Sequence, residues 1–302
     1  MKVLLTGANG LIGSRIVRIL LQQAGVEVLA TGKGACRLSQ TQDLQYFSFD
    51  LTREEEVVDV FNSFEPDTVI HCAAISHVDQ CEQNPAECWK VNVKATEFLL
   101  KAAAKFKAHF IYFSSDFVFE GVKRVYNEDD LREPVNYYGQ SKVAAENLVR
   151  AYPNSKAIIR TILVYGVSES ISRSNLILWV KKSLENKKPI RVAKDQFRMA
   201  TWVDDLALAA CKIACNKKEG VFHVSGSQYL SVYEMAVKIA DFYNLNTDLI
   251  EPVLTSELSE HTPRPLSTGF DLKKTEELLG RMTLSFEEGL KHFEKQFSAL
   301  NL

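Results

Sequence analysis

The sequence has neither a long hydrophobic run nor a block of like charges. Nowhere do 18 apolar residues follow one another, so a membrane-spanning helix is not expected. Lys and Arg total 36 against 38 Asp and Glu. This balance gives no electrostatic reason to expect nucleic acid or an anionic membrane as a partner. The apolar stretch Val3–Leu5 is too short for the core of a signal peptide, and we expect it to form a buried first strand.

The six cysteines form no metal-binding pattern. None belongs to a C-x-x-C pair, and no histidine spacing complements them, so we expect no metal site. They are predicted to be buried, reduced thiols of a cytoplasmic protein. The six positions are Cys36, Cys72, Cys81, Cys88, Cys211 and Cys215.

Short β-rich runs alternate with helical patterns through the first half of the chain. Strict alternation predicts a parallel sheet with right-handed crossovers and helices on both faces, that is, a Rossmann-type doubly wound α/β fold. The expected strands are 3–6, 26–31, 46–49, 68–72, 109–114 and 157–161, and the expected helices are 11–23, 53–64, 85–105 and 138–151.

The pattern changes after Tyr165-Gly166, where a smaller C-terminal α/β substrate lobe is expected. We predict a dinucleotide-binding domain of residues 1–165 plus 196–226 and a lobe of residues 166–195 plus 227–302. Ser231-x-x-Glu234 and Ser285-x-x-Glu288 match capping boxes and open two late helices. The other expected elements are helix 171–184, strand 190–192, helix 203–215, strand 221–224 and a loop over 254–269.

A glycine-rich turn lies between the first strand and the first helix. Three glycines allow a tight turn, a close approach to a pyrophosphate and close helix–strand packing, and the helix N-terminus offers N–H groups to phosphate. Following a strand and preceding a helix, this pattern predicts dinucleotide binding. The binding residues expected here are Gly7, Asn9, Gly10, Leu11, Ile12 and Gly13.

Cations rather than a carboxylate follow the second strand. Lys33 and Arg37 stand where an acidic residue usually binds the ribose 2′-hydroxyl of NAD. An anionic 2′-phosphate is favoured by this arrangement, so we predict NADP as cofactor, with NADPH preferred and NADH left open. Asp50 is a candidate N-cap for the helix that begins near Arg53.

Tyr138 and Lys142 form the predicted chemical centre. A spacing of four places the phenol and the ammonium on one helix face, where Lys142 can lower the pKa of Tyr138. Such a tyrosine can donate a proton to a carbonyl oxygen. Ser114 and Ser115 end a strand about two dozen residues upstream, where a hydroxyl can bond the same oxygen. The predicted catalytic residues are Ser115, Tyr138 and Lys142, whereas His71 is expected to be a packed strand-end residue.

The G-x-x-G-x-x-G spacing, the serine and the Y-x-x-x-K pair together resemble the extended short-chain dehydrogenase/reductase family. The resemblance implies that Asp50 and Leu51 meet the adenine. It also implies that Cys72, Ala73 and Ala74 line the cofactor through their small side chains. Lys142 would also bind the nicotinamide ribose, and Ser114, Tyr138 and Lys142 would contact the cofactor.

Further stretches are similar to dTDP-4-dehydrorhamnose reductases. They include H71CAAISHVDQCE82, S114SDFVFEG121 and P134VNYYGQSK142. The resemblance implies NAD(P)H-dependent reduction of the 4-keto group of a nucleotide-linked deoxysugar. Leu163 stands where those reductases usually have Trp, and Ser115 where they often have Thr. The implied substrate-binding residues are Ser115, Asp116, Phe117, Val118, Leu163, Arg198 and Arg264.

Two other functions stay open. The segment 198–205 also resembles nucleotide-sugar epimerases, so an epimerase or dehydratase with retained NAD is an alternative. SSDFVFEG and PVNYYGQSK are also similar to the regulatory β subunit of methionine adenosyltransferase, a binding partner rather than an enzyme. The expected partner is a nucleotide-sugar substrate, with a homodimer left open and neither nucleic acid nor a membrane expected.

Overall fold

The structure, a computed structural model, describes residues 1–39, 44–167, 175–258 and 262–299. Its larger part is built on a seven-stranded sheet in the order β12-β7-β5-β4-β1-β2-β3, in which all neighbours run parallel. The strand order reverses between β1 and β4, which confirms the predicted doubly wound fold. The strands are β1 (Lys2–Thr6), β2 (Glu27–Gly32), β3 (Gln45–Ser48), β4 (Thr68–His71), β5 (His109–Ser115), β7 (Lys156–Thr161) and β12 (Gly220–Val224).

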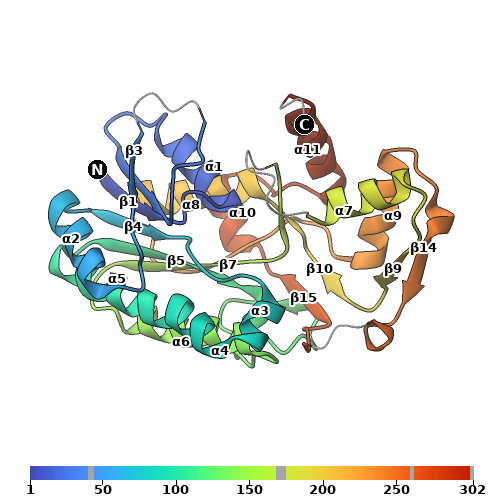
Figure 1. The fold of residues 1–302 in the computed structure, drawn as a ribbon, viewed down its shortest axis with the longest axis horizontal. Coiled ribbons are helices and arrows are strands. Elements are labelled where there is room, and N and C mark those ends of the chain that lie inside the picture. The colour runs from blue at the N-terminus through green and yellow to red at the C-terminus, as the bar shows by residue number, and fades with distance from the viewer. Residues whose placement is uncertain (40–43, 168–174, 259–261, 300–302) are drawn as a thin grey trace.

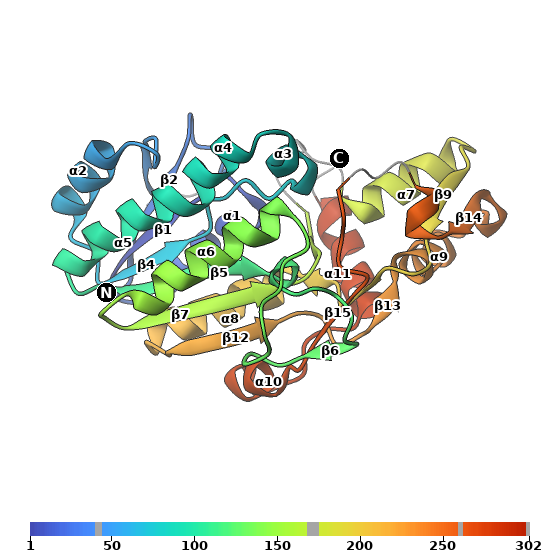
Figure 2. The same cartoon turned by 90° about the horizontal axis from the view of Figure 1, so that it is seen from below.

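Helices cover both faces of this sheet (Figure 1). α1 (Leu11–Leu20) and α8 (Val203–Cys215) pack on one face and bury Ile16, Val17 and Leu206 against the strands. The second face is covered by α2 (Glu54–Phe64), α5 (Ala95–Lys105) and α6 (Tyr137–Ala151), which lie side by side in Figure 2.

The amphipathic pattern of α2 shows why these helices form. Val57, Val60, Phe61 and Phe64 recur at helical spacing and are buried in the core. Glu54–Glu56 occupy the first turn, where the helix dipole favours negative charge. The helix ends at Glu65, whose φ of 51° is left-handed.

The smaller part of the molecule has its own hydrophobic cluster and a four-stranded sheet in the order β13-β10-β15-β6. Two short pairs, β8 with β11 and β9 with β14, complete its strands. Its helices are α7 (Leu176–Glu185), α9 (Val232–Phe242) and α11 (Phe286–Ala299), whereas α10 (Lys273–Leu279) packs on α8 and β12 of the larger part. The strands are β6 (Val125–Tyr126), β8 (Val164–Tyr165), β9 (Ile190–Ala193), β10 (Phe197–Arg198), β11 (Thr201–Trp202), β13 (Leu230–Ser231), β14 (Ile250–Val253) and β15 (Ser267–Phe270).

Several expected elements differ from the structure. The chain after β4 forms an unexpected helix α3 (Val78–Gln83), and the helix expected over 85–105 is α4 (Pro85–Trp89), a π-helical turn η1 (Lys90–Lys94) and α5. The expected loop 254–269 contains the 3₁₀ turn η4 (Thr255–Glu257) and the strand β15. Further 3₁₀ turns are η2 (Asp116–Val118) and η3 (Thr247–Leu249). Of the helix expected over 171–184, residues 171–174 lie outside the described ranges.

Two local predictions were wrong, whereas both predicted capping boxes are confirmed, that of Ser285 and Glu288 by the bond of each backbone N–H to the other side chain. Asp50 does not cap α2, whose N-cap is Arg53, because its carboxylate binds the backbone and hydroxyl of Thr52 instead. Cys36 and Cys215 are exposed rather than buried. The capping box of Ser231 and Glu234 is present at the start of α9. No helix within the described ranges is long and apolar enough to cross a membrane.

Candidate active site

The carboxyl ends of β1 and β4 open onto a cavity of about 1160 Å³. In open α/β sheets, ligands bind where the strand order reverses, which is between these two strands. The turn after β1 and the small residues Cys72, Ala73 and Ala74 after β4 both line the cavity. The fold thus brings the predicted cofactor residues to one place.

The glycine turn has no room for side chains. Gly7 has a φ of 77°, and a Cβ there would lie 2.7 Å from the amide nitrogen of Ala73. A Cβ at Gly13 would clash with the carbonyl oxygen of Gly7. Gly10 is the N-cap of α1, so no side chain occupies the cap, and no acidic residue lies in the first turn. The helix end is therefore suited to an anion, and the cradle fits the pyrophosphate of a dinucleotide.

Asn9 organises the segment that follows β2. Its Oδ1 accepts the backbone N–H of Arg37 at 2.9 Å, and its Nδ2 donates to the carbonyl of Ala35 and to the Tyr46 hydroxyl, each at 3.0 Å. These bonds hold Arg37 beside the glycine turn. Lys33 and Arg37 both line the cavity, as expected.

Lys33 forms an ion pair with Asp50 that the sequence did not predict. Its Nζ lies 3.3 Å from Oδ2 of Asp50. Hydrogen bonds from Thr52, helped by Lys33, lower the pKa of Asp50 to about 2, so this carboxylate is charged at neutral pH. Part of the positive charge at Lys33 is therefore neutralised.

Tyr138 enters the cavity from the first turn of α6. The side chain of Asn136 caps this helix through the N–H of Gly139 at 2.9 Å, which fixes the start of α6. The Tyr138 ring packs edge-on against Phe117, with centroids 5.6 Å apart. Ser115, which ends β5, lines the same cavity as Tyr138.

Lys142 lies one turn further along α6, and its Nζ donates to the carbonyl of Phe113 at 2.7 Å. The ammonium also lies 4.4 Å from the centroid of the Tyr112 ring. Burial lowers the pKa of Lys142 to about 8. Burial raises the pKa of Tyr138 well above its usual range, against the lowering effect of Ser115. The pKa of Tyr138 is therefore raised rather than lowered as predicted, and the Lys142 ammonium is directed at the Phe113 carbonyl of β5.

A row of buried hydrogen bonds joins the cofactor loop to the turn beside α6. His71 bonds the hydroxyl of Thr6 through Nδ1 at 2.7 Å and that of Thr96 through Nε2 at 3.0 Å. Thr96 donates to the carbonyl of Asn92 at 2.8 Å, and the Asn92 amide donates to Ser141 of α6 at 3.0 Å. His71 is thus a packed strand-end residue, as predicted.

The predicted substrate-binding residues differ in how far they face the cavity. Leu163 lines it, is 43% exposed and has a left-handed φ of 36°. Arg264 also lines it and forms an ion pair with Asp79 at 3.2 Å. The prediction that Val118 binds substrate was wrong, because its side chain is fully buried against Phe119 in a separate hydrophobic cluster.

Asp116 and Arg198 line the cavity but already bind other groups. The Arg198 guanidinium donates to the carbonyls of Phe197, Pro265 and Leu266, and its Nε lies 3.7 Å from Asp116. Arg198 is thus held by backbone carbonyls of the chain, and its predicted contact with the substrate stays a prediction.

Other lining residues were not foreseen. Ser76 and His77 lie just before α3, a helix that the sequence did not reveal, and Glu87 and Lys90 lie on α4 and η1. The residues from α11 form an aromatic face with helical spacing that the sequence shows but that was not assigned to the site. These unforeseen lining residues include Ser76, His77, Glu87, Lys90, Phe286, Phe293 and Phe297.

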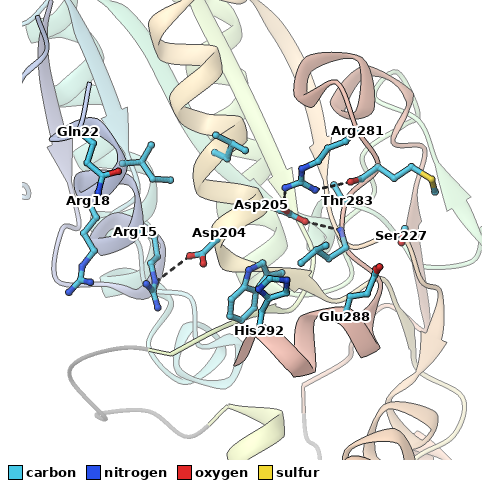
Figure 3. A pocket seen from close by; sticks show the side chains of 15 residues that line it. Arg15, Arg18, Gln22, Asp204, Asp205, Ser227, Arg281, Thr283, Glu288 and His292 are labelled. Carbon is cyan, nitrogen blue, oxygen red and sulfur yellow. Dashed lines mark hydrogen bonds and ion pairs between the residues drawn. The ribbon is translucent and has the colours of Figure 1, made fainter. Parts of the chain in front are cut away.

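A second cavity, of about 850 Å³, lies between α1, α8 and the segment that leads into α11 (Figure 3). Asp204 and Asp205 in the first turn of α8 line it. Asp204 pairs with Arg15 at 3.4 Å, and Asp205 pairs with Arg281 and accepts the N–H of Leu284 at 2.8 Å. These bonds connect the first helix of the chain to its C-terminal segment.

Comparisons with known proteins agree with this geometry. The chain is 31% identical to the spore coat polysaccharide biosynthesis protein SpsK of Bacillus subtilis, over 99% of this chain and 98% of that protein. It is 32% identical to methionine adenosyltransferase 2 subunit beta of Mus musculus, over 96% of this chain and 86% of that protein. A crystal structure of dTDP-4-dehydrorhamnose reductase from Bacillus anthracis in complex with NADP has a TM-score of 0.82 and 27% identity, covering 98% and 99% of the two chains.

These similarities agree with the resemblance to dTDP-4-dehydrorhamnose reductases that was expected from the sequence. The model of the RmlD substrate binding domain matches residues 1–299, almost the whole chain. The chain therefore belongs to the RmlD substrate binding domain family.

Proposed function

We propose that the chain is an NADPH-dependent reductase of the 4-keto group of a nucleotide-linked deoxysugar. The observation that carries the proposal is that Tyr138, Ser115 and Lys142 line the same cavity as the glycine turn. A proton donor and a dinucleotide cradle in one cavity are what carbonyl reduction requires.

The chain's own groups handle the proton. Bound NADPH supplies the hydride. Tyr138, which burial keeps protonated, donates its proton to the carbonyl oxygen. Lys142 provides a positive charge near the phenolate that remains, and its lowered pKa of about 8 lets it gain or lose a proton near neutrality.

Two observations support the proposed substrate: the activity of a similar protein and the aromatic residues that line one side of the cavity. The crystal structure with 27% identity is a dTDP-4-dehydrorhamnose reductase, so a nucleotide-linked keto sugar is the favoured substrate class. We assign the sugar nucleotide to the lobe of residues 166–195 plus 227–302. The lining aromatic residues Phe286, Phe293 and Phe297 belong to this lobe.

The experiment is a turnover assay with a panel of nucleotide 4-keto sugars, followed through the absorbance of NADPH. Net NADPH consumption with at least one sugar is the expected result. Tightly retained NAD⁺ with no net consumption would instead identify an epimerase or dehydratase. A parallel measurement of NADPH and NADH dissociation constants tests the cofactor preference, and equal or tighter NADH binding would contradict it.

A regulatory subunit is the second candidate. It is favoured by the 32% identity to methionine adenosyltransferase 2 subunit beta over 96% of the chain. Purification of a stoichiometric partner, together with no turnover on any sugar of the panel, would support this function over the reductase. The presence of Ser115, Tyr138 and Lys142 does not distinguish a reductase from a regulatory subunit, since a binding protein can keep a dinucleotide site.

A further inference from the structure

Tyr46 binds the segment that carries the predicted cofactor cations. It belongs to β3, which pairs with β2 in the large sheet. Its hydroxyl donates to the carbonyl of Gly34 at 2.9 Å and accepts from Nδ2 of Asn9 at 3.0 Å. One phenol thus connects the glycine turn to the segment after β2, whose Lys33 and Arg37 line the cavity.

The direction of these bonds is fixed by groups that can only accept. A carbonyl oxygen has no hydrogen, so the phenol hydrogen goes to Gly34, and the Asn9 amide donates through Nδ2 to the carbonyl of Ala35. Oδ1 of Asn9 then accepts the backbone N–H of Arg37. Burial raises the pKa of Tyr46, against the lowering effect of Asn9, so the phenol keeps its hydrogen at neutral pH. Loss of this hydroxyl would therefore remove one bond from the segment and one of the acceptors that orient Asn9.

The same hydroxyl fills the space beside Gly32, the last residue of β2. NAD-binding Rossmann folds carry an acidic residue in this region, about 20 residues after the glycine turn. A Cβ at Gly32 would lie 2.9 Å from Oη of Tyr46 and 3.3 Å from Nδ2 of Asn9. Gly32 is not among the glycines with a left-handed φ. Space rather than backbone conformation therefore excludes a side chain there.

The pyrophosphate cradle is held by bonds that do not involve Tyr46. The N–H of Ala8 donates to the carbonyl of Thr31 at 2.9 Å, and the N–H of Gly10 donates to the carbonyl of Gly7 at 2.9 Å. The part of the site shared by NADPH and NADH should therefore survive the loss of the Tyr46 hydroxyl.

We propose that Tyr46 sets the preference for NADPH over NADH. Its hydroxyl holds the segment with Lys33 and Arg37 at the cavity wall, and it fills the space that an acidic side chain would need at position 32. Tyr46 is a positioning residue, since it acts through Asn9 and Gly34. The role rests on the proposed cofactor preference and on no particular sugar.

The first experiment measures the dissociation constants of NADPH and NADH for the full chain and for Tyr46→Phe. The Kd of NADPH should rise about 5-fold to 10-fold and that of NADH by no more than about twofold, because the lost bonds hold only the segment with the cations. Tyr152→Phe is the matched control, since it also removes a phenol bond to a backbone carbonyl, that of Ala108 at 2.7 Å. Equal weakening of both cofactors in Tyr46→Phe, or the same change of their ratio in Tyr152→Phe, would overturn the proposal.

The second experiment tests the space beside β2. Gly32→Asp should lower the Tm more in the wild-type background than in Tyr46→Phe, because only the wild-type chain has a hydroxyl 2.9 Å from the added Cβ. The double variant should bind NADH more tightly than NADPH, since a carboxylate accepts from the ribose 2′-hydroxyl and repels a 2′-phosphate. Equal losses of Tm in the two backgrounds would contradict the proposal.

The wild-type measurement separates this role from the proposed cofactor preference. If the wild-type chain binds NADH as tightly as NADPH, the cofactor preference fails, and the role of Tyr46 fails with it. If the wild-type chain prefers NADPH and Tyr46→Phe keeps the same ratio of dissociation constants, only the role of Tyr46 fails. Both results are independent of turnover.

Discussion

At the scale of single residues, the protonation state of Tyr138 matches the proposed reaction. Reduction of a carbonyl needs a proton donor that holds its proton until the hydride arrives. Burial raises the pKa of Tyr138, so the phenol is protonated throughout the physiological range. Loss of the hydroxyl should therefore affect the chemical step more than binding.

We expect Tyr138→Phe to bind NADPH with unchanged affinity and to reduce kcat by about 10² to 10⁴. The ring that packs against Phe117 is retained in this variant, so the fold is preserved. Tyr137→Phe is the control, because the neighbouring phenol is not among the residues that line the cavity. Steady-state rates and cofactor titrations measure the difference, and a wild-type rate in Tyr138→Phe would remove the phenol from the mechanism.

The sequence predicted the residues of the cavity better than their hydrogen bonds. The sequence spacing was enough to predict that the glycine turn, Ser115, Tyr138 and Lys142 share one site. These residues lie at strand ends or on one helix face, and all line the same cavity. The partners of Lys142 and Arg198 are backbone carbonyls distant in sequence, and such pairs depend on how the elements pack. Val118 was misassigned because three consecutive residues of a 3₁₀ turn cannot all face one side.

At the scale of elements, the junction of β1 and α1 depends on the absence of side chains. Gly13 begins the contact between the helix and the turn, and its Cα faces the carbonyl of Gly7. This close approach is what brings the first turn of α1 to the cavity.

Gly13→Ala should cost about 2 kcal/mol of unfolding free energy, because the added methyl group has no space. It should also weaken NADPH binding, since the turn must move away from α1. Ser14→Ala is the control at the adjacent position, where only the bond to the carbonyl of Leu11 is lost. Urea unfolding and cofactor titration would show both effects, and equal results for the two variants would contradict the argument.

The alternation of strands and helices made most elements predictable, and the exceptions have physical reasons. α3 has only six residues, too few for a recognisable hydrophobic repeat. The π-helical turn at Lys90–Lys94 interrupts a sequence that otherwise has a continuous helical pattern, because tertiary bonds of Asn92 to Ile75 and Ser141 fix it. β6, β10 and β13 have two residues each, so no alternation can reveal them.

At the scale of the whole molecule, the first turn of α8 holds the two ends of the chain together. Asp205 is 3% exposed and binds Arg281 and the N–H of Leu284, both just before α11. Asp204 is more exposed and pairs with Arg15 of α1 (Figure 3).

Asp205→Ala should lower the free energy of unfolding by about 2 kcal/mol, because the buried N–H of Leu284 loses its acceptor. Asp204→Ala, the neighbouring control, should cost less than about 1 kcal/mol, since its ion pair is partly solvated. Thermal and urea unfolding compare the two. A larger loss for Asp204→Ala would show that this ranking is wrong.

The stability of the molecule should also depend on pH through His71. Burial lowers its pKa to about 3, whereas in the unfolded chain the pKa is about 6.5. Between these values the unfolded state binds more protons, so the free energy of unfolding falls as the pH decreases. From pH 6.5 to pH 5 this single group accounts for about 2 kcal/mol. Urea unfolding at pH 7 and pH 5 should show a smaller decrease for His71→Asn than for wild type, and an identical decrease would contradict this assignment.

The row of buried bonds through His71 also fixes which ring nitrogen carries the hydrogen. Thr96 gives its only hydrogen to the carbonyl of Asn92, so it must accept from Nε2 of the imidazole. The neutral ring then has a bare Nδ1, and Thr6 must donate to it. Thr6 Oγ1 is left with lone pairs directed at the N–H of Ala73, 3.4 Å away. A single imidazole tautomer thus fixes the direction of every hydrogen bond from the carbonyl of Asn92 to the backbone N–H of Ala73, in the predicted cofactor loop.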